Sequence, residues 1–293
     1  MATKQIDRLI HAIREKNNPT ALGLDTRIEY LPETLAAKHA YPADAVYRFN
    51  TALLEGLAQI VPCVKIQAAY YELMGPDGVI CMQKTAAEAK RLGYVVIIDA
   101  KRGDIGATAA AYSAAYLGEN APFAADFLTV NPYLGSDGVE PFVADCAKTG
   151  RGIFVLVKTS NPSSGEFQDM TTTDGRTIYQ IVGDKVSEWG AGQIGEEGYS
   201  SVGAVVGATY SAQGKELRGR MPGTFFLVPG YGAQGASAAD LAGCFDERGG
   251  GAVVNASRSL ICAYKKNGNP DFVAGAIEEA VRMRSELCAA LGL

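Results

Sequence analysis

Eight short apolar runs, most of them followed by a longer amphipathic segment, constrain the fold of this chain more than any other feature. The runs are nearly continuous in apolar residues, which is typical of parallel strands that are covered on both faces. They lie at 20–26, 63–69, 94–101, 127–131, 152–159, 201–208, 225–230 and 251–256. Between them, apolar residues recur at helical spacing, as in 43–57, 79–92, 107–117 and 178–189. Strands and helices are therefore expected to alternate along the chain.

Eight strand–helix units predict a (β/α)8 TIM barrel. Such barrels typically need about 250 residues, and this chain has 293, which leaves room for longer loops. A doubly wound parallel sheet is the alternative that the same pattern allows. No shift in composition marks a linker, so we expect one barrel domain over 1–293, with an N-terminal helix over about 1–17 and a C-terminal helix over about 270–291.

The charge balance restricts the kinds of partner. Lys and Arg number 27 and Asp and Glu number 32, which gives a formal net charge of −5. Without a basic excess, the chain is not expected to bind nucleic acid or a membrane surface, although a few local cations suffice for a small anionic ligand. The first residues are amphipathic and charged, with no apolar run long enough for a signal peptide or a membrane span. We therefore expect a cytoplasmic protein.

Cysteine and histidine, two residue types that often carry chemistry, are poorly placed for it here. The six cysteines form no CxxC pair and most have apolar neighbours, which indicates buried, reduced thiols rather than disulfides or a zinc site. Only two histidines occur, His11 and His39. Their scarcity excludes most serine–histidine, cysteine–histidine and zinc–histidine chemistries. Catalysis by this chain would therefore depend on carboxylates and lysines.

Charged residues at the end of the third predicted strand form the densest candidate site. The carboxyl ends of barrel strands carry the catalytic groups of such folds, and Asp99, Lys101 and Asp104 lie at this end. Strand alternation places Asp99 and Lys101 on the same side. With Lys65 from the second strand, they could form an alternating array of two lysines and two aspartates that keep one another ionised. The same pattern also fits a structural salt-bridge network.

The other predicted strands supply further polar groups at the same end of the barrel. These groups are Asp25, Asn131, Lys158, Ser160 and Arg258. The seventh strand runs into the glycine-rich segment 230–235, whose backbone amides could approach phosphate oxygens closely. The long polar segment 160–177 follows the fifth strand, and it is interpreted as an active-face loop that could act as a lid, or as an insertion without function.

Several motifs resemble those of orotidine 5′-phosphate decarboxylases. Residues 99–108, DAKRGDIGAT, are similar to the signature of that family, DxKxxDI followed by a threonine. The segments VNPYLG at 130–135 and KTSNP at 158–162 resemble the longer bacterial, or type 2, subfamily. PGYGAQG at 229–235 and the late Arg258 make the resemblance to the family more specific. The motifs follow in the expected order along nearly the whole barrel. The DxKxxD core alone is shared with sugar-phosphate decarboxylases and synthases of the same superfamily.

This resemblance implies decarboxylation of orotidine 5′-monophosphate to uridine 5′-monophosphate, the last step of de novo UMP synthesis, without metal or organic cofactor. Lys101 would stabilise and protonate the carbanion, and Asp99 would lie beside the substrate carboxylate. Lys65 would contact Asp99 and the ribose. Asp104 would complete the array from the neighbouring subunit and, with Thr108, contact the nucleotide. A homodimer with shared active sites is therefore implied.

The resemblance also assigns groups that bind the rest of the substrate. Asp25 would hold a ribose hydroxyl, and Ser160 would bond to the pyrimidine ring. The 5′-phosphate would be bound by Gln234, Arg258 and backbone amides near Gly232, Ala233 and Gly235. Asn131, Lys158 and Arg102 are left without a role.

Two other functions fit part of the pattern. A magnesium-dependent sugar-phosphate decarboxylase or synthase would need an additional acidic ligand near the second strand. Lys65 and Gln67 occupy that strand, and the nearest acid is Glu72. A non-catalytic nucleotide-binding barrel would gain little from clustered charges that are costly to desolvate. The decarboxylase without a metal site is therefore the expected function.

Overall fold

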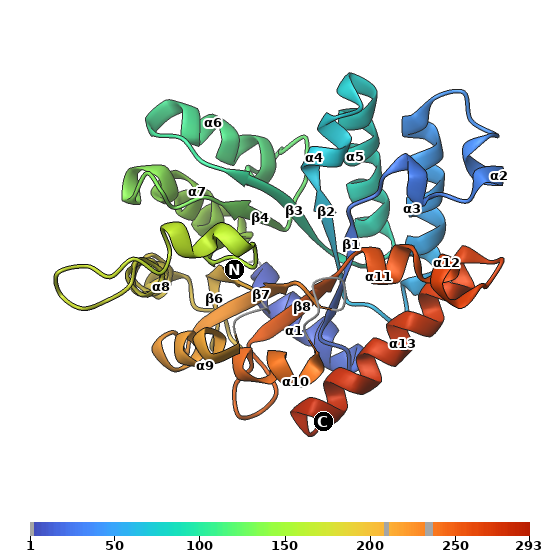
Figure 1. The fold of residues 1–293 in the computed structure, drawn as a ribbon. Coiled ribbons are helices and arrows are strands. Elements are labelled where there is room, and N and C mark those ends of the chain that lie inside the picture. Colours follow the sequence, from blue (N-terminus) through green and yellow to red (C-terminus); the bar gives the residue numbers. More distant parts are fainter. Residues whose placement is uncertain (1–2, 208–210, 232–236) are drawn as a thin grey trace.

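The fold is a closed barrel of parallel strands surrounded by helices (Figure 1). The computed structural model describes residues 3–207, 211–231 and 237–293. Within these ranges, eight strands pair in chain order, and β8 pairs with β1 to close the sheet. The strands are β1 (Thr20–Leu24), β2 (Cys63–Gln67), β3 (Val95–Arg102), β4 (Phe127–Val130), β5 (Gly152–Lys158), β6 (Ser200–Val206), β7 (Thr224–Pro229) and β8 (Ala252–Ala256). This closure confirms the predicted (β/α)8 barrel, because a doubly wound sheet is open.

Helices surround the barrel, and most of them follow a strand. The longer ones are α1 (Gln5–Lys16), α3 (Pro42–Leu57), α5 (Gly75–Arg91), α6 (Gly106–Leu117), α7 (Ser136–Thr149), α8 (Ile178–Gly190), α9 (Ser211–Arg220) and α13 (Phe272–Leu291). Short helical turns are α2 (Glu33–Ala36), α4 (Ala68–Glu72), α10 (Ala238–Leu241), α11 (Arg258–Ile261) and α12 (Ala263–Asn267). The helix predicted at 79–92 begins earlier, at Gly75, because Pro76 is favoured in a first helical turn.

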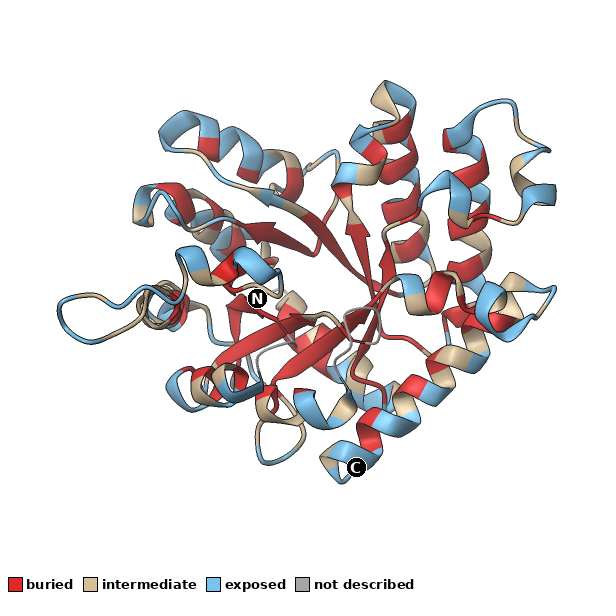
Figure 2. Cartoon of the chain, in the orientation of Figure 1, coloured by how far each residue is buried: buried red, intermediate tan, exposed pale blue. Residues whose placement is uncertain are grey.

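The strands are buried on both faces, as their apolar sequences predict (Figure 2). Side chains such as Leu22 and Val64 point outward and pack in the layer between strands and helices. Alternate side chains, such as Phe127 and Phe154, fill the barrel interior, where their rings lie 5.0 Å apart. Helix α1 contributes apolar residues, including Leu9, to this inner core. Interior and exterior are thus two separate apolar layers, with the sheet between them.

Helix α1 covers the amino-terminal end of the barrel. The backbone N–H of Gln5 donates to the Gly150 carbonyl just before β5, over 2.8 Å. Lys16 Nζ donates to the Val61 carbonyl just before β2, over 3.0 Å. The cysteines, all within the described ranges, are free thiols, and burial raises the pKa of Cys81 to about 11. Of the helices within the described ranges, none combines the length and apolar character that crossing a membrane requires.

The polar segment after β5 has structure of its own. A 3-10 helix spans Pro162–Glu166, and an antiparallel bridge joins Thr171 to Thr177 immediately before α8. Thr177 and Gln180 form a capping box that fixes the start of α8. The segment therefore returns to the barrel along a defined path beside the carboxyl end of β5.

Candidate active site

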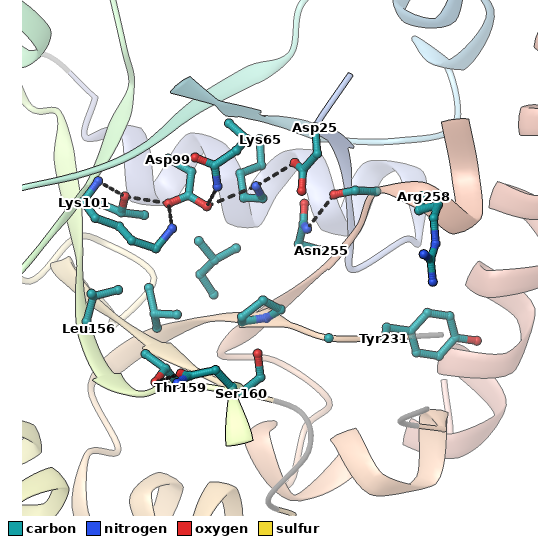
Figure 3. Close-up of a pocket in the computed structure, with 18 of the residues that line it drawn as sticks. Asp25, Lys65, Asp99, Lys101, Leu156, Thr159, Ser160, Tyr231, Asn255 and Arg258 are labelled. Carbon is teal, nitrogen blue, oxygen red and sulfur yellow. Dashed lines mark hydrogen bonds and ion pairs between the residues drawn. The ribbon is translucent and has the colours of Figure 1, made fainter. Parts of the chain in front are cut away.

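A cavity of about 770 Å³ opens at the carboxyl end of the barrel. Asp99, Lys65 and Asp25 line one wall, and Thr159 and Ser160 lie on the opposite wall (Figure 3). Arg258 and Tyr231 also line the cavity. Apolar inward-facing residues of the barrel, Leu156, Val205 and Leu227, complete it. The cavity therefore places charged, polar and apolar surfaces around one ligand-sized space.

Asp99, at the end of β3, connects the charged groups of this site. Its Oδ2 accepts hydrogen bonds from Lys65 Nζ over 3.1 Å and from Gln67 Nε2 over 2.9 Å. Its Oδ1 accepts from Lys101 Nζ over 2.7 Å and from Thr129 Oγ1 over 2.9 Å. Strands β2, β3 and β4 are neighbours in the barrel, so these donors reach one carboxylate from both sides. The arrangement fixes both lysine ammonium groups relative to Asp99.

Lys65 is held between two carboxylates. Its Nζ also donates to Asp25 Oδ1 over 3.1 Å. Burial by itself lowers the pKa of Lys65, but Asp25 and Asp99 outweigh burial and raise that pKa above its usual value. Burial likewise raises the pKa of Asp99, but the ammonium groups of Lys65 and Lys101 outweigh it and hold that pKa well below its usual range. Both groups are therefore ionised at neutral pH although they are buried.

Lys101 occupies an unusual backbone conformation. Its φ is 47°, in the left-handed region, and the pairing of β3 with β4 shifts between Ile98 and Arg102. Its backbone N–H donates to Thr129 Oγ1 over 2.9 Å. The side chain is 46% exposed and remains accessible from the cavity. Asp99 and Lys101 meet, as predicted, but through a local irregularity of the strand rather than through simple alternation.

Asp104 and Thr108 do not join the array of their own chain. The Asp104 carboxylate accepts the backbone N–H of Ile105 over 2.8 Å, and Thr108 is exposed in the first turn of α6. Neither is among the described residues that line the cavity. Within the described chain, Asp25 is the second carboxylate on Lys65, a contact that sequence reasoning did not anticipate.

The predicted phosphate-binding residues lie only partly within the described ranges. Arg258 is exposed at the start of α11 and lines the cavity. Ser160 lines the cavity from the opposite side (Figure 3). The remaining predicted residues, Gly232, Ala233, Gln234 and Gly235, lie outside the described residues.

Sequence reasoning missed Thr129 and left Gln67 without a role. Thr129 is a polar residue in the otherwise apolar β4, and this was the available signal. Asn255, at the end of the eighth predicted strand, was likewise left without a role; it is buried at the end of β8 and lines the cavity. Whether these side chains reach the cavity depends on which side of each strand faces it. The sequence of a single strand therefore identifies them only weakly.

The residues without a predicted role have structural partners. Arg102 pairs with Glu72 and lies over the rings of Tyr112 and Tyr116, 5.5 and 5.9 Å from their centroids. Asn131 Oδ1 accepts the backbone N–H of Tyr133 over 3.0 Å.

No group of three or more His, Cys, Asp and Glu residues in the described part of the chain is arranged to hold a metal ion. Glu72, the first acidic residue after β2 in the sequence, pairs with Arg102 and is not among the described residues lining the cavity.

The structure is that of a (β/α)8 barrel in which lysine ammonium and aspartate carboxylate groups are fixed together at the carboxyl end of the strands, the end that carries the active sites of barrel enzymes. More specifically, the chain belongs to the orotidine 5′-phosphate decarboxylase / HUMPS family, whose model matches residues 36–269. This match confirms the resemblance seen in the motifs.

Relatives of similar length support the same assignment. An orotidine 5′-phosphate decarboxylase of Rhodopirellula baltica is 47% identical over 264 residues, which cover 87% of each chain. That of Clostridium novyi is 40% identical over 284 residues, covering 96% of this chain and 98% of the relative. The solved structure of Leishmania donovani OMP decarboxylase is 27% identical and has a TM-score of 0.78, covering 99% of this chain and 100% of that one.

Proposed function

We propose that this chain decarboxylates orotidine 5′-monophosphate to uridine 5′-monophosphate and carbon dioxide, in pyrimidine biosynthesis. The observation that carries this proposal is the Lys101 ammonium, fixed 2.7 Å from Asp99 at the edge of the cavity, in a chain of this family. The magnesium-dependent sugar-phosphate enzymes and the non-catalytic barrel have no comparable observation in their favour.

Lys101 would supply the charge and the proton that the reaction needs. The substrate carboxylate is attached to C6 of the pyrimidine ring. When the bond between C6 and the carboxylate breaks, its electron pair stays on C6 and carbon dioxide leaves. A localised carbanion results, and a nearby fixed ammonium stabilises it electrostatically. Lys101 then transfers a proton to C6 and regains one from solvent. Because this ammonium provides the stabilisation, we propose that the reaction needs no metal or organic cofactor.

The other array residues would prepare Lys101 for this step. Asp99 and Lys65 keep the site ionised and preorganised, so little reorganisation accompanies the charge change. Asp99 would also lie beside the substrate carboxylate, where like-charge repulsion disfavours the ground state. Asp25 would accept a hydrogen bond from a ribose hydroxyl while it holds Lys65.

The remaining contacts would orient the nucleotide along the cavity. Ser160 would bond to the pyrimidine ring, on the wall opposite the array (Figure 3). Arg258 and Gln234, with amides of Gly232, Ala233 and Gly235, would bind the 5′-phosphate. Binding of the distant phosphate can then contribute to positioning at the reacting carbon.

A homodimer with shared sites is part of the proposal. Asp104 and Thr108 would reach the cavity of the neighbouring subunit. Exposed apolar side chains near them, on the loops after the adjacent strands β2, β3 and β4, support this arrangement, because a second copy could cover them. They are Leu73, Ile105, Tyr133 and Leu134. The free thiols fit a reducing compartment, and we place the enzyme in the cytoplasm.

The direct test is an ultraviolet assay of orotidine 5′-monophosphate loss, run with and without a metal chelator. The wild-type chain is expected to turn over in both conditions. Lys101→Ala is expected to lower kcat/KM by about 10³-fold or more, because it removes the stabilising charge and the proton donor. No turnover by folded wild-type protein would overturn the proposed function. If the chelator abolished turnover, the proposed substrate would be upheld, but the proposal that the reaction needs no metal would be contradicted.

A further inference from the structure

Lys158, which the proposed mechanism does not use, is a completely buried lysine at the end of β5. Its side chain has 0% exposure. Its Nζ donates to Asp169 Oδ1 over 2.8 Å and to Ser164 Oγ over 3.1 Å. The same ammonium lies 5.8 Å from the centroid of the Tyr179 ring. Asp169 and Ser164 both belong to the long segment between β5 and α8, so one buried charge holds two points of that segment.

The burial of Lys158 makes this attachment strong. An ammonium removed from water is costly unless a carboxylate and further acceptors compensate it. The Asp169 side chain is 39% exposed, so its own carboxylate could be hydrated without Lys158. Lys158 therefore depends on the ion pair more than Asp169 does. The Lys158 ammonium cannot reach water without disrupting the end of β5, whereas the Asp169 carboxylate is already partly exposed to water. The need to neutralise Lys158 therefore helps to hold the segment against the strand.

The residue next to Asp169 carries this attachment to the cavity wall. Gln168 Oε1 accepts the backbone N–H of Thr159 over 2.9 Å, and Gln168 Nε2 donates to Thr159 Oγ1 over 2.7 Å. Thr159, Ser160 and Gln168 all line the cavity. The Gln168 backbone is fixed as well, because its N–H donates to the Ser164 carbonyl over 2.9 Å. The position of this polar wall thus depends on residues that are bonded to Lys158.

We propose that the buried Lys158–Asp169 ion pair is a positioning device that holds the wall formed by Thr159, Ser160 and Gln168 at the distance required by the pyrimidine ring. This inference rests on the proposed function, which puts a nucleotide in the cavity with its ring toward this wall. Lys158 and Asp169 act through the wall and do not touch the substrate. Weakening the pair should therefore impair recognition of the ring and leave phosphate and ribose binding intact.

The experiment compares binding of two ligands that differ by the ring. Dissociation constants of uridine 5′-monophosphate and ribose 5-phosphate are measured for the wild type and Asp169→Asn, together with kcat and KM for orotidine 5′-monophosphate. Asp169→Asn is expected to weaken uridine 5′-monophosphate binding about tenfold and to lower kcat/KM at least as much. Ribose 5-phosphate binding should stay within about twofold of wild type. Asp169→Glu, which restores the charge, should recover part of the loss.

Two further variants keep the test decisive. Asp174→Asn is the matched control, because it removes a carboxylate of the same segment that pairs with Arg176 at the surface, and it should bind both ligands normally. Lys158→Met/Asp169→Asn removes both charges, so it folds without a buried unpaired ammonium even if the single variant does not. It should still lose affinity for the nucleotide but not for ribose 5-phosphate.

The outcomes separate this inference from the proposed function. Normal nucleotide binding by the double variant, or equal loss of both ligands, would overturn the positioning role while wild-type turnover upholds the decarboxylase. A wild-type chain that neither turns over the substrate nor binds uridine 5′-monophosphate would overturn the decarboxylase and this inference with it.

Discussion

Asp99 accepts hydrogen bonds from residues of three adjacent strands, and this concentration of donors explains how a carboxylate can be buried and charged at once. A lone buried carboxylate would take up a proton to avoid the cost of desolvation. Here burial does favour the protonated form, but Lys65 and Lys101 reverse the balance and hold the pKa of Asp99 well below its usual range. The charge that the proposed mechanism needs is therefore also a contribution to the stability of the fold.

Asp99→Asn should show this contribution as a dependence of stability on pH. The pKa of Asp99 is lower in the folded state than in the unfolded state. As the pH falls, the unfolded chain therefore takes up a proton at Asp99 before the folded chain does, and the stability that the ionised carboxylate contributes is progressively lost. We expect the wild type to exceed Asp99→Asn by about 2 kcal/mol in free energy of unfolding above pH 5, and this difference to shrink below about pH 4. Urea unfolding from pH 7 to pH 3 measures it. An unchanged difference at pH 3 would contradict the argument.

Helix α1 closes the barrel at the end opposite the cavity. Leu9, with no exposed surface, belongs to the same interior cluster as the inward side chains of the strands. The hydrogen bonds of the helix include one from the Gln5 backbone N–H to Gly150, which precedes β5, and one from the Lys16 side chain to Val61, which precedes β2. The helix therefore supports the barrel at the end away from the charged array. Stability and catalysis should be separable at this element.

Leu9→Ala should lower the free energy of unfolding by about 2–5 kcal/mol, because it leaves a cavity in the inner core. The kcat of the remaining folded protein should change by less than about twofold, because the site lies at the other end of the barrel. Chemical unfolding and the ultraviolet assay measure the two effects. His11→Ala, on the exposed side of the same helix, is the control and should cost less than about 1 kcal/mol. A large loss of kcat in folded Leu9→Ala would show that the two ends are coupled.

At the scale of the whole molecule, the position of Asp104 bears on the oligomer, because this carboxylate lies outside the array of its own barrel. If the neighbouring subunit supplies this carboxylate, each site needs Lys101 from one chain and Asp104 from the other. The exposed apolar side chains on the loops after β2, β3 and β4 would then form part of the contact between the chains.

Mixing two inactive variants tests this shared-site dimer. Lys101→Ala and Asp104→Ala should each lose most activity alone. After dissociation and random re-association, half of the dimers would contain one chain of each kind, and one of their two sites would be intact, so roughly a quarter of wild-type activity should return. Light scattering of both variants and of the mixture measures the oligomer. No recovery in a mixture shown to exchange subunits would contradict shared sites.

Much of the fold could be read from the order of apolar runs. Parallel strands buried on both faces leave a strong signal, and each observed strand lies within a few residues of its predicted range. The candidate lysines and aspartates were also predicted, since a local motif, 99–108, carries most of them. Local sequence is sufficient for these features because burial and spacing act over a few neighbouring residues.

The contacts between these residues required the folded barrel. Thr129 lies on β4, and Asp25 directly follows β1. Both reach the array only because β4 pairs with β3 and β1 pairs with β2 in the closed barrel. Lys101 turns toward the cavity at a backbone irregularity that strand alternation does not predict. The partner of Lys158 lies in a segment that folds back over the end of β5. A sequence pattern tells which side chains are polar, but their pairing depends on distances between segments far apart in the chain, which are set when the barrel closes.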